Sequence, residues 1–446
     1  MSCVSSSSIS ILFNGGALDP FLPSGGIRQG DPLSPYLFIL CMEVLGALIL
    51  DKCNAKLWNP IKASRGGPAF SHLFFADDLV LFARADRKNC VAIREVLDSF
   101  CSLSGQKVSQ AKSRVFFSPN VPTDERSEMC DTLGFWSTPS LGKYLGFPIK
   151  HSAMPQDFGY IVERVQSRLA RWKANLLSFA GRLMLTQAVT TAIPNYAMQC
   201  VALPTKILNS VDRLSRNFLW GSTKSKKKIH LVNWKKITKP KRDGGLGIQA
   251  AKAKNIANLA KLNWRLHSER SSLWAKVLSH KYRNPRRAFS SRPYTRTCST
   301  TWAAIRKGEA VFKTGSKWTV GKDSHLSLWY DKWLDKGPLR GLIEGPLNRG
   351  EEVITLKEVT EFSGWDWQGC SFSFPERLLS EIKATPITFS AQITDRITWY
   401  SSPSGNFNMK EAYKLAVLEV EGMYNRNFVG DWIWKVPTIP KIKCFL

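Results

Sequence analysis

The sequence predicts an α+β protein: a small antiparallel sheet with helices, then a mainly helical basic region, then a Trp-rich C-terminal region. Alternating apolar and polar residues predict hairpins at 8–23 and 72–83, and amphipathic spacing recurs between about 155 and 275. From about residue 276 onward Trp, Gly, Pro and Ser recur, which favours short strands. The chain has 446 residues, 43% of them hydrophobic, which is enough for two or three domains with a buried core.

Local signals predict the individual elements. Asn14-Gly15 is a hairpin turn signal, and helical spacing predicts a helix over residues 87–103 that ends near Gly105. Residues 106–118 should be extended, and residues 143–148 should form a short strand. Amphipathic stretches predict four further helices, at 157–177, 181–200, 206–220 and 248–267.

An apolar run at residues 33–50 has nearly the length of a membrane span. However, Glu43 lies inside it, and Pro32 and Pro35 lie at its start. Because proline is tolerated in the first turn of a helix, these residues favour a buried helix that begins near Pro35. No membrane association is expected.

Two adjacent acids, Asp77 and Asp78, interrupt the apolar residues of the second hairpin. Burial would desolvate two like charges, so we expect them at a hairpin tip, either exposed to water or bound to divalent cations. Mg²⁺ prefers carboxylate oxygens, and two such ions can stabilise the attacking and leaving oxygens of phosphoryl transfer. An ordinary exposed turn remains the alternative on this pattern alone.

A loop precedes the apolar run. In it Arg28 and Gln29 offer hydrogen-bond donors to phosphate or base, and Gly30 permits unusual backbone dihedrals. By itself the loop fits an ordinary turn followed by a helix start equally well.

The net charge is +28, and residues 164–307 carry all of it, with 31 Lys or Arg against three acids. Trp residues are interleaved with these cations. A solvated basic face is the alternative for any short run, but an imbalance over so long a stretch predicts contact with nucleic acid. The ten cysteines form no C-x-x-C pair, so we expect reduced thiols and no recognisable zinc site.

Several motifs then follow one another in a specific order. Together they resemble the reverse transcriptase of plant LINE-type (non-LTR) retrotransposons over nearly the whole chain. The matching segments are GIRQGDPLSPYLF at 26–38, FADD at 75–78, SGQK at 104–107, KYLG at 143–146, SFAGR at 178–182, FLWG at 218–221, GGLG at 244–247 and GNF at 405–407.

The resemblance implies an RNA-directed DNA polymerase that uses two Mg²⁺ ions, an RNA template, a DNA primer and deoxynucleoside triphosphates. Asp77 and Asp78 would be metal ligands, and Lys112 would approach the nucleotide phosphates unless it is simply a solvated strand-end lysine. The other implied roles are template and nucleotide positioning by Arg28, Gln29, Gly30 and Phe75, primer grip by Leu145 and Gly146, and contacts to an RNA–DNA duplex by Arg182, Lys224, Lys226, Lys227, Lys228, Lys235, Lys236, Lys239, Lys241 and Arg242.

The resemblance also divides the chain into a partial palm at 1–150, a thumb-like basic region at 151–275, a connecting Trp-rich region at 276–395, and the start of a zinc-binding-type region at 396–446. The family's palm has an earlier strand that ends in a third metal-binding aspartate, and Asp19 is not expected to replace it. The zinc ligands are expected beyond Leu446. We therefore expect a fragment truncated at both ends, with metal binding and polymerase activity weakened or lost.

Three functional hypotheses remain open. The first is a reverse transcriptase fragment, the second is a non-catalytic RNA- or DNA-binding remnant, and the third is a degenerate product that folds poorly. A group II intron maturase is a related alternative, because it has a similar palm, but the sequence after residue 178 argues against it. An intracellular location, in nucleus or cytoplasm, follows from the family, and the oligomeric state is not predicted.

Overall fold

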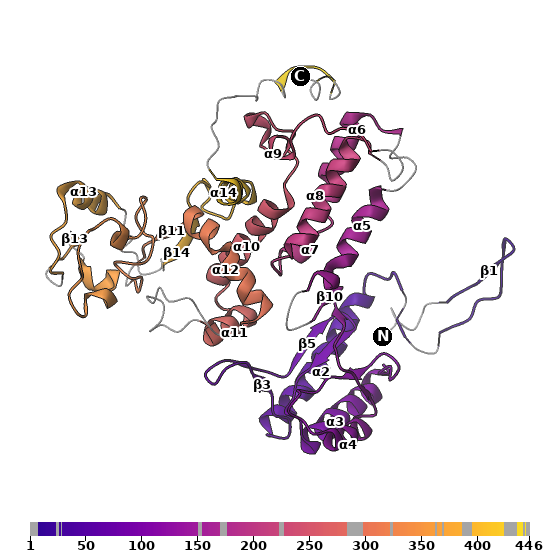
Figure 1. Ribbon diagram of the computed structural model, residues 1–446. Coiled ribbons are helices and arrows are strands. Elements are labelled where there is room, and N and C mark those ends of the chain that lie inside the picture. The colour runs from indigo at the N-terminus through magenta and orange to yellow at the C-terminus, as the bar shows by residue number, and fades with distance from the viewer. Residues whose placement is uncertain are drawn as a thin grey trace. The chain divides into compact units, whose positions relative to one another are not determined.

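The computed structural model describes residues 8–23, 26–27, 29–149, 154–169, 176–222, 227–282, 298–321, 324–361, 364–367, 370–385, 395–422, 435–439 and 442. Contacts divide the chain into two compact units, Met1–Lys150 (unit 1) and His151–Leu446 (unit 2). In Figure 1 unit 1 runs from indigo to purple and unit 2 from magenta to yellow.

The described part of unit 1 combines three helices with short two-stranded ladders, all antiparallel except β7–β8 (Figure 1). The helices are α2 (Ser34–Asn54), α3 (Arg87–Ser104) and α4 (Thr123–Leu133), and the paired strands are β1 (Leu12–Phe13) with β2 (Gly16–Ala17), β3 (Ile61–Lys62) with β4 (Ala69–Phe70), β5 (His72–Phe75) with β6 (Asp78–Leu81), β7 (Arg114–Val115) with β8 (Trp136–Ser137), and β9 (Lys143–Tyr144) with β10 (Phe147–Pro148).

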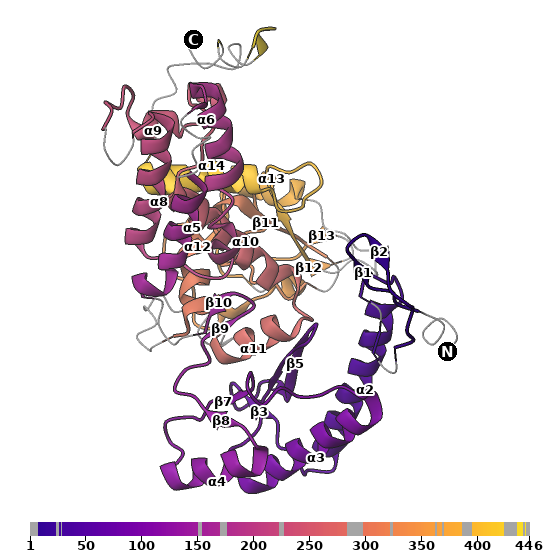
Figure 2. The same ribbon diagram turned by 90° about the vertical axis from the view of Figure 1, so that its right-hand side faces the viewer.

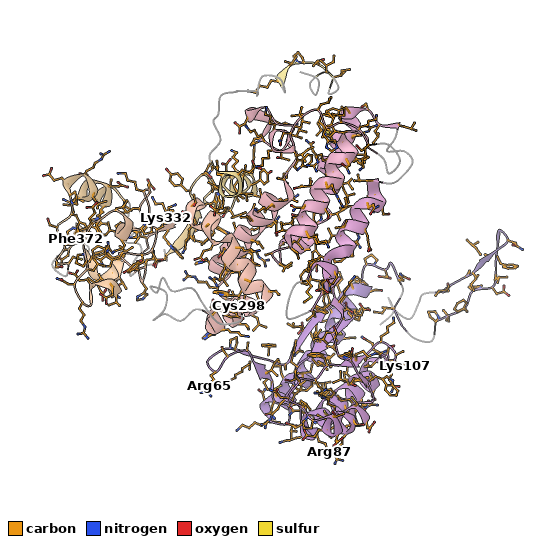
Figure 3. All side chains as sticks on the ribbon, in the orientation of Figure 1. Arg65, Arg87, Lys107, Cys298, Lys332 and Phe372 are labelled. Carbon is orange, nitrogen blue, oxygen red and sulfur yellow. The ribbon has the colours of Figure 1, made fainter. Side chains whose placement is uncertain are left out.

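Helix α3 confirms the helix expected at 87–103. It begins where Oδ1 of Asp86 accepts a hydrogen bond from the Asn89 amide at 2.8 Å, and it ends at Gly105, which adopts φ 70°. The acceptor satisfies an amide that has no partner inside the helix, and glycine takes the left-handed conformation without steric cost. An ion pair of 3.3 Å between Arg87 and Glu128 joins α3 to α4. Figure 3 labels Arg87.

Helix α2 confirms the predicted helix start but not the predicted burial. Only Leu45 and Ile49 are buried, whereas the side chains of Tyr36 and Leu40 are 68% and 63% exposed. Within unit 1 the prediction of a buried helix is wrong, because α2 packs on α3 and β5 along one side and no described element of unit 1 covers its other side. Among the described helices none combines the length and apolar character needed to cross a membrane.

The hairpin predictions are confirmed, but the single antiparallel sheet is not. Asn14 and Gly15 adopt φ 47° and 83°, the two positive values of a type I′ turn. Each described strand pairs with one other strand only, so all the described sheets are two-stranded. The β5–β6 hairpin, for example, has no third described strand at either outer edge. Residues 143–148 form a hairpin, β9–β10, instead of one strand, and a turn interrupts the extended segment expected at 106–118.

Unit 2 begins as a helical region and continues with shorter elements. Helices α5, α8 and α10 match three of the predicted amphipathic stretches, although residues 170–175 of the first stretch lie outside the described residues. The stretch at 181–200 is divided among α6, the π-helix η3 and α7, and α9 lies outside all four stretches. The elements are η1 (Pro155–Phe158), α5 (Gly159–Leu169), α6 (Phe179–Leu185), the π-helix η3 (Thr186–Thr190), α7 (Asn195–Met198), α8 (Thr205–Leu219), α9 (Trp234–Ile237), η4 (Lys241–Asp243), α10 (Ala251–Ser268), α11 (Leu273–Tyr282), α12 (Thr300–Gly315), β11 (Ser316–Thr319), η6 (Leu339–Gly341), η7 (Glu351–Val353), η8 (Leu356–Val359), β12 (Thr360–Glu361), β13 (Gly364–Trp365), α13 (Glu376–Ala384), β14 (Arg396–Trp399) and α14 (Met409–Glu421).

Helix α10 lies at the centre of unit 2, where its small residues let two other helices approach closely. A Cβ atom at Gly308 of α12 would lie 2.3 Å from the carbonyl carbon of Leu259, so only glycine fits this crossing. Helix α14 packs Ala412 and Ala416 into the same core, although it is far away in sequence. This core therefore joins elements from all three predicted segments after residue 150.

The Trp-rich region joins the same core through β11, which pairs with β14 across some eighty residues of sequence. Trp399 of β14 packs edge-on against Trp264 of α10 at 6.3 Å between ring centroids. Figure 3 labels Lys332 and Phe372 in this region. The Lys332 ammonium donates to the Thr314 carbonyl at 2.8 Å, which ties the region to the end of α12.

Candidate metal site and nucleic-acid interface

The tip of the β5–β6 hairpin presents both acids. Phe75 pairs with Asp78 in the register, so Ala76 and Asp77 form the two-residue turn between the strands. Ala76 adopts φ 50°, which is unusual for a residue with a Cβ and costs on the order of 1–3 kcal/mol. Backbone strain of this kind concentrates at functional sites, and here it aims Asp77 and Asp78 outward.

The base of the hairpin is held by contacts that fix where its tip lies. The Phe82 amide donates to the Ser71 carbonyl at 2.7 Å, and the indole of the fully buried Trp58 donates to the Phe82 carbonyl at 2.9 Å. Phe74 packs over Gly46 of α2, 3.8 Å from where a Cβ would stand. The acids therefore stand on a rigid element, as a metal or catalytic site requires.

Asp77 and Asp78 are exposed, and neither carboxylate accepts a hydrogen bond or forms an ion pair with any residue in the described ranges. Two free carboxylates side by side repel each other, and a divalent cation relieves that repulsion. Mg²⁺ commonly takes one or two protein carboxylates and completes its octahedral shell with water and substrate phosphates. The donor set fits Mg²⁺ in this way, although the described residues contain no cluster of three or more His, Cys, Asp or Glu.

The β9–β10 hairpin lies close to the acids. Burial raises the pKa of the Tyr144 phenol first, and the negative charge of Asp78 raises it further, which places the two groups near each other. Leu145 and Gly146 adopt φ 50° and 77° in the connecting turn. Tyr144 was not predicted as a site residue; its place beside Leu145 in the motif KYLG was the one available signal.

The other predicted residues of unit 1 are exposed. Phe75 is 59% exposed beside Asp78, and Gln29 and Gly30 lie in an exposed loop, where Gly30 adopts φ 89°. Lys112 is exposed in the turn that precedes β7. No described interaction joins Gln29, Gly30 or Lys112 to the acids, and Arg28 lies outside the described residues.

The predicted phosphate-binding lysines of unit 2 are mostly exposed, around α9 and η4. Lys227, Lys228, Lys235, Lys236 and Lys241 are exposed and Lys239 is half-buried. Lys224 and Lys226 lie outside the described residues, as does the side chain of Arg242. Most of the predicted zinc-binding-type segment after residue 422 also lies outside them.

Arg182 occupies a more enclosed position than the lysines. Its guanidinium fills the space beside Gly221, where a Cβ would lie 2.1 Å from Nη1, and Gly221 adopts φ 71°. Phe179 packs against Trp220 at 5.5 Å. The motifs SFAGR and FLWG therefore meet, and packing between α6 and the end of α8 accounts for both; nucleic-acid contact by Arg182 stays a prediction.

The motif GGLG shapes the turn after the basic segment. A Cβ at Gly245 would lie 1.9 Å from the carbonyl oxygen of Lys239, and the Leu246 amide donates to the Ile237 carbonyl at 2.9 Å. The side-chain Nε2 of Gln187 donates to the Leu246 carbonyl at 2.6 Å. The turn thus holds Lys239 and its neighbours against α6 and the π-helix.

Two ionisable groups of unit 2, Asp212 and Lys254, are half-buried. Burial raises the pKa of Asp212 to about 6, partly opposed by the hydrogen bond from the Ala251 amide at 3.1 Å, which starts α10. Burial also lowers the pKa of Lys254 to about 8, and its ammonium donates to the Thr191 carbonyl at 2.7 Å. Both groups therefore have hydrogen-bond partners within unit 2.

Comparison with known proteins connects both regions to one family. Residues 2–149 match the family described as reverse transcriptase (RNA-dependent DNA polymerase). A putative ribonuclease H protein of Arabidopsis thaliana is 36% identical over 307 residues, which is 67% of this chain and 49% of that protein.

Two transposon proteins are also similar. A 149 kDa uncharacterized protein of transposon TX1 of Xenopus laevis is 23% identical over 420 residues, 85% of this chain and 31% of that protein. The Pol polyprotein of a type-2 retrotransposable element of Drosophila melanogaster is 27% identical over 266 residues, 56% of this chain and 24% of that protein. The chain thus spans about half the length of the plant relative and less than a third of the two transposon proteins. The chain belongs to the reverse transcriptase family of non-LTR retrotransposons.

Proposed function

We propose that this chain binds an RNA–DNA duplex through its basic region and supplies Asp77 and Asp78 to the Mg²⁺ site of an RNA-directed DNA polymerase. The observation that carries the proposal is the strained two-residue turn, which presents two unpaired carboxylates on a firmly anchored hairpin. An ordinary surface turn has no reason to keep this arrangement, because the backbone of Ala76 is strained and the two carboxylates repel each other.

Asp77 and Asp78 would hold the metal, and Mg²⁺ bound there would stabilise charge on the oxygens that react in nucleotide joining. Phe75 extends beside the acids as an apolar surface for the sugar or base of a nucleotide. Tyr144 stands near Asp78 and offers a hydroxyl to a ligand phosphate or to a metal-bound water. Gln29, Gly30 and Lys112 are proposed to contact template, nucleotide or phosphates.

The basic region supports the second part of the proposal. Cations that neutralise phosphates release condensed counterions, and this gives affinity without sequence preference. The exposed lysines around α9 and η4 suit this role, because they are long, flexible point charges held on a packed support.

A second candidate function is nucleic-acid binding without catalysis. The excess of 31 cations over three acids between residues 164 and 307 favours it independently of the acids, because duplex binding needs only the basic surface.

Primer extension on an RNA template with Mg²⁺ tests whether this chain polymerises by itself, and binding to the same primer–template tests the basic surface that both candidate functions need. The described residues bring two carboxylates to the tip whereas the family resemblance implies three, so we expect this chain by itself to bind the primer–template without extending it. Incorporation that disappears in Asp77→Ala would show instead that the chain polymerises by itself. Failure of the wild type to bind the primer–template would remove both candidates.

A further inference from the structure

The loop that joins α8 to α9 exposes aliphatic side chains among lysines. Ile229 is 84% exposed, Leu231 is 78% exposed and Val232 is 41% exposed, and Lys227 and Lys228 beside them are also exposed. A cluster of aliphatic side chains exposed to water is energetically unfavourable, and such clusters mark interaction surfaces.

The described residues 227–233 of this loop are held in place on both sides of the exposed aliphatic residues. His230, between Ile229 and Leu231, turns inward and stacks on Trp220 at 6.5 Å and 24°. The Lys228 amide donates to Oγ of Ser222 at 3.1 Å, and Asn233 caps α9 through the Lys235 amide at 2.9 Å. His230 therefore points inward, while Ile229 and Leu231 on either side of it remain exposed.

The support beneath the loop is the apolar cluster of α6, α8 and α9. Leu183, Leu219 and Ile237 are buried in it, and Trp220 and Trp234 pack around them. Figures 1 and 2 both show α6, α8 and α9 together at one end of unit 2. The loop thus sits on a formed core and does not depend on a partner to be placed.

The positive charge around the loop favours a polyanionic ligand. Between Asp212 and Asp243 the sequence contains eleven Lys or Arg and no acid. The aromatic rings of the loop face inward, whereas proteins that bind single strands turn aromatic rings outward to stack on bases. Exposed aliphatic side chains flanked by phosphate-binding cations instead suit the sugars and base edges of a groove.

We propose that Ile229 and Leu231 enter the minor groove of an RNA–DNA duplex and select its A-like form. This inference rests on the proposed duplex binding and adds the residues that recognise duplex shape. The minor groove of A-form duplexes is wide and shallow, so short aliphatic side chains reach its floor, while that of B-form DNA is only about 6 Å wide. The flanking lysines contact the phosphates on both rims.

The test compares the full chain with Ile229→Ser/Leu231→Ser by fluorescence anisotropy on a labelled RNA–DNA duplex and on a DNA duplex of the same sequence, each over a range of salt concentrations. We expect the double variant to bind the RNA–DNA duplex about tenfold more weakly, because two apolar contacts are lost. Its affinity for the DNA duplex and the salt slope on both duplexes should stay unchanged, since no phosphate contact is removed. Val353→Ser, a change at a 63% exposed aliphatic residue beside Glu351 and Glu352, should match the wild type.

Each other outcome has a defined meaning. Equal losses on both duplexes, or no loss on either, would overturn the groove contact while leaving duplex binding intact. Binding of the wild type to vesicles containing phosphatidylserine that disappears in the double variant, with duplex affinity unchanged, would assign the loop to a membrane surface and overturn the inference. A wild type that binds neither duplex would refute the proposed function itself. Coincident thermal melting curves for the three proteins exclude misfolding as the cause of a loss.

Discussion

The hairpin tip of unit 1 and the basic loop of unit 2 are candidate sites of opposite kinds. At the tip two acids stand at fixed positions on a strained turn with an anchored base. Around the loop many lysines are exposed to a similar degree, and the proposed phosphate binding assigns the same role to all of them. A single substitution should therefore remove a function at the tip, whereas substitutions around the loop should weaken binding step by step.

The largest expected effect concerns the loop. Affinity for an RNA–DNA duplex should fall about a thousandfold between 50 and 200 mM salt, as for proteins with six or more phosphate contacts. Lys235→Gln/Lys236→Gln should reduce the slope of log affinity against log salt by about 2, whereas Lys383→Gln/Lys410→Gln, outside the basic stretch, should leave it unchanged. Anisotropy titrations measure both, and equal slopes for the two variants would contradict a basic surface centred on α9.

The next effect concerns the turn that supports the lysines. Gly245→Ala places a Cβ 1.9 Å from the Lys239 carbonyl oxygen and should lower the free energy of unfolding by about 3 kcal/mol. Gly341→Ala is the matched control, because nothing lies within 4 Å of the added Cβ. Urea unfolding compares the two, and equal stabilities would show that the turn opens without cost.

A smaller effect concerns pH. The folded state raises the pKa of Asp212 from 3.8 to about 6, so between these values the folded chain holds more protons than the unfolded chain. The contribution of this group to stability is therefore full below pH 4 and is lost as the pH rises through 6. Asp212→Asn keeps the hydrogen-bond acceptor for the Ala251 amide and should be more stable than the wild type at pH 7, by about 2 kcal/mol.

The comparison at pH 3 provides the control for this prediction. There the advantage of Asp212→Asn should nearly vanish, because pH 3 lies below both the unfolded pKa of 3.8 and the folded pKa of about 6, so Asp212 is mostly protonated in the folded and the unfolded chain. Unfolding curves at the two pH values measure the difference, and an advantage independent of pH would show that burial of the charge is not its cause.

Local patterns predicted the parts of the fold that local chemistry determines. The Asn14-Gly15 turn, the hairpin around Asp77 and the capped helix α3 follow from residues that lie next to each other, and the structure confirms all three. The acids could be predicted individually, because two charges inside an apolar pattern are informative by themselves.

Contacts between distant residues could not be predicted in this way. The pairing of β11 with β14, the packing of Arg182 against Gly221 and the closeness of Tyr144 to Asp78 depend on how elements pack, and no local pattern encodes them. The exposed face of α2 was missed for the same reason, because its apolar sequence does not show which side another element covers.

The most direct test of the account is metal binding at the hairpin tip. Mn²⁺, which shares the preference of Mg²⁺ for oxygen ligands, is titrated into the full chain while its free form is followed by electron paramagnetic resonance. Asp77→Asn/Asp78→Asn should weaken binding at least about tenfold, since loss of even an indirect partner of a metal costs about 10–100-fold. Asp124→Asn/Glu125→Gln, a matched pair of adjacent acids in the first turn of α4, should leave it unchanged. Equal Mn²⁺ affinities for the wild type and both variants would contradict the assignment of Asp77 and Asp78 as metal ligands.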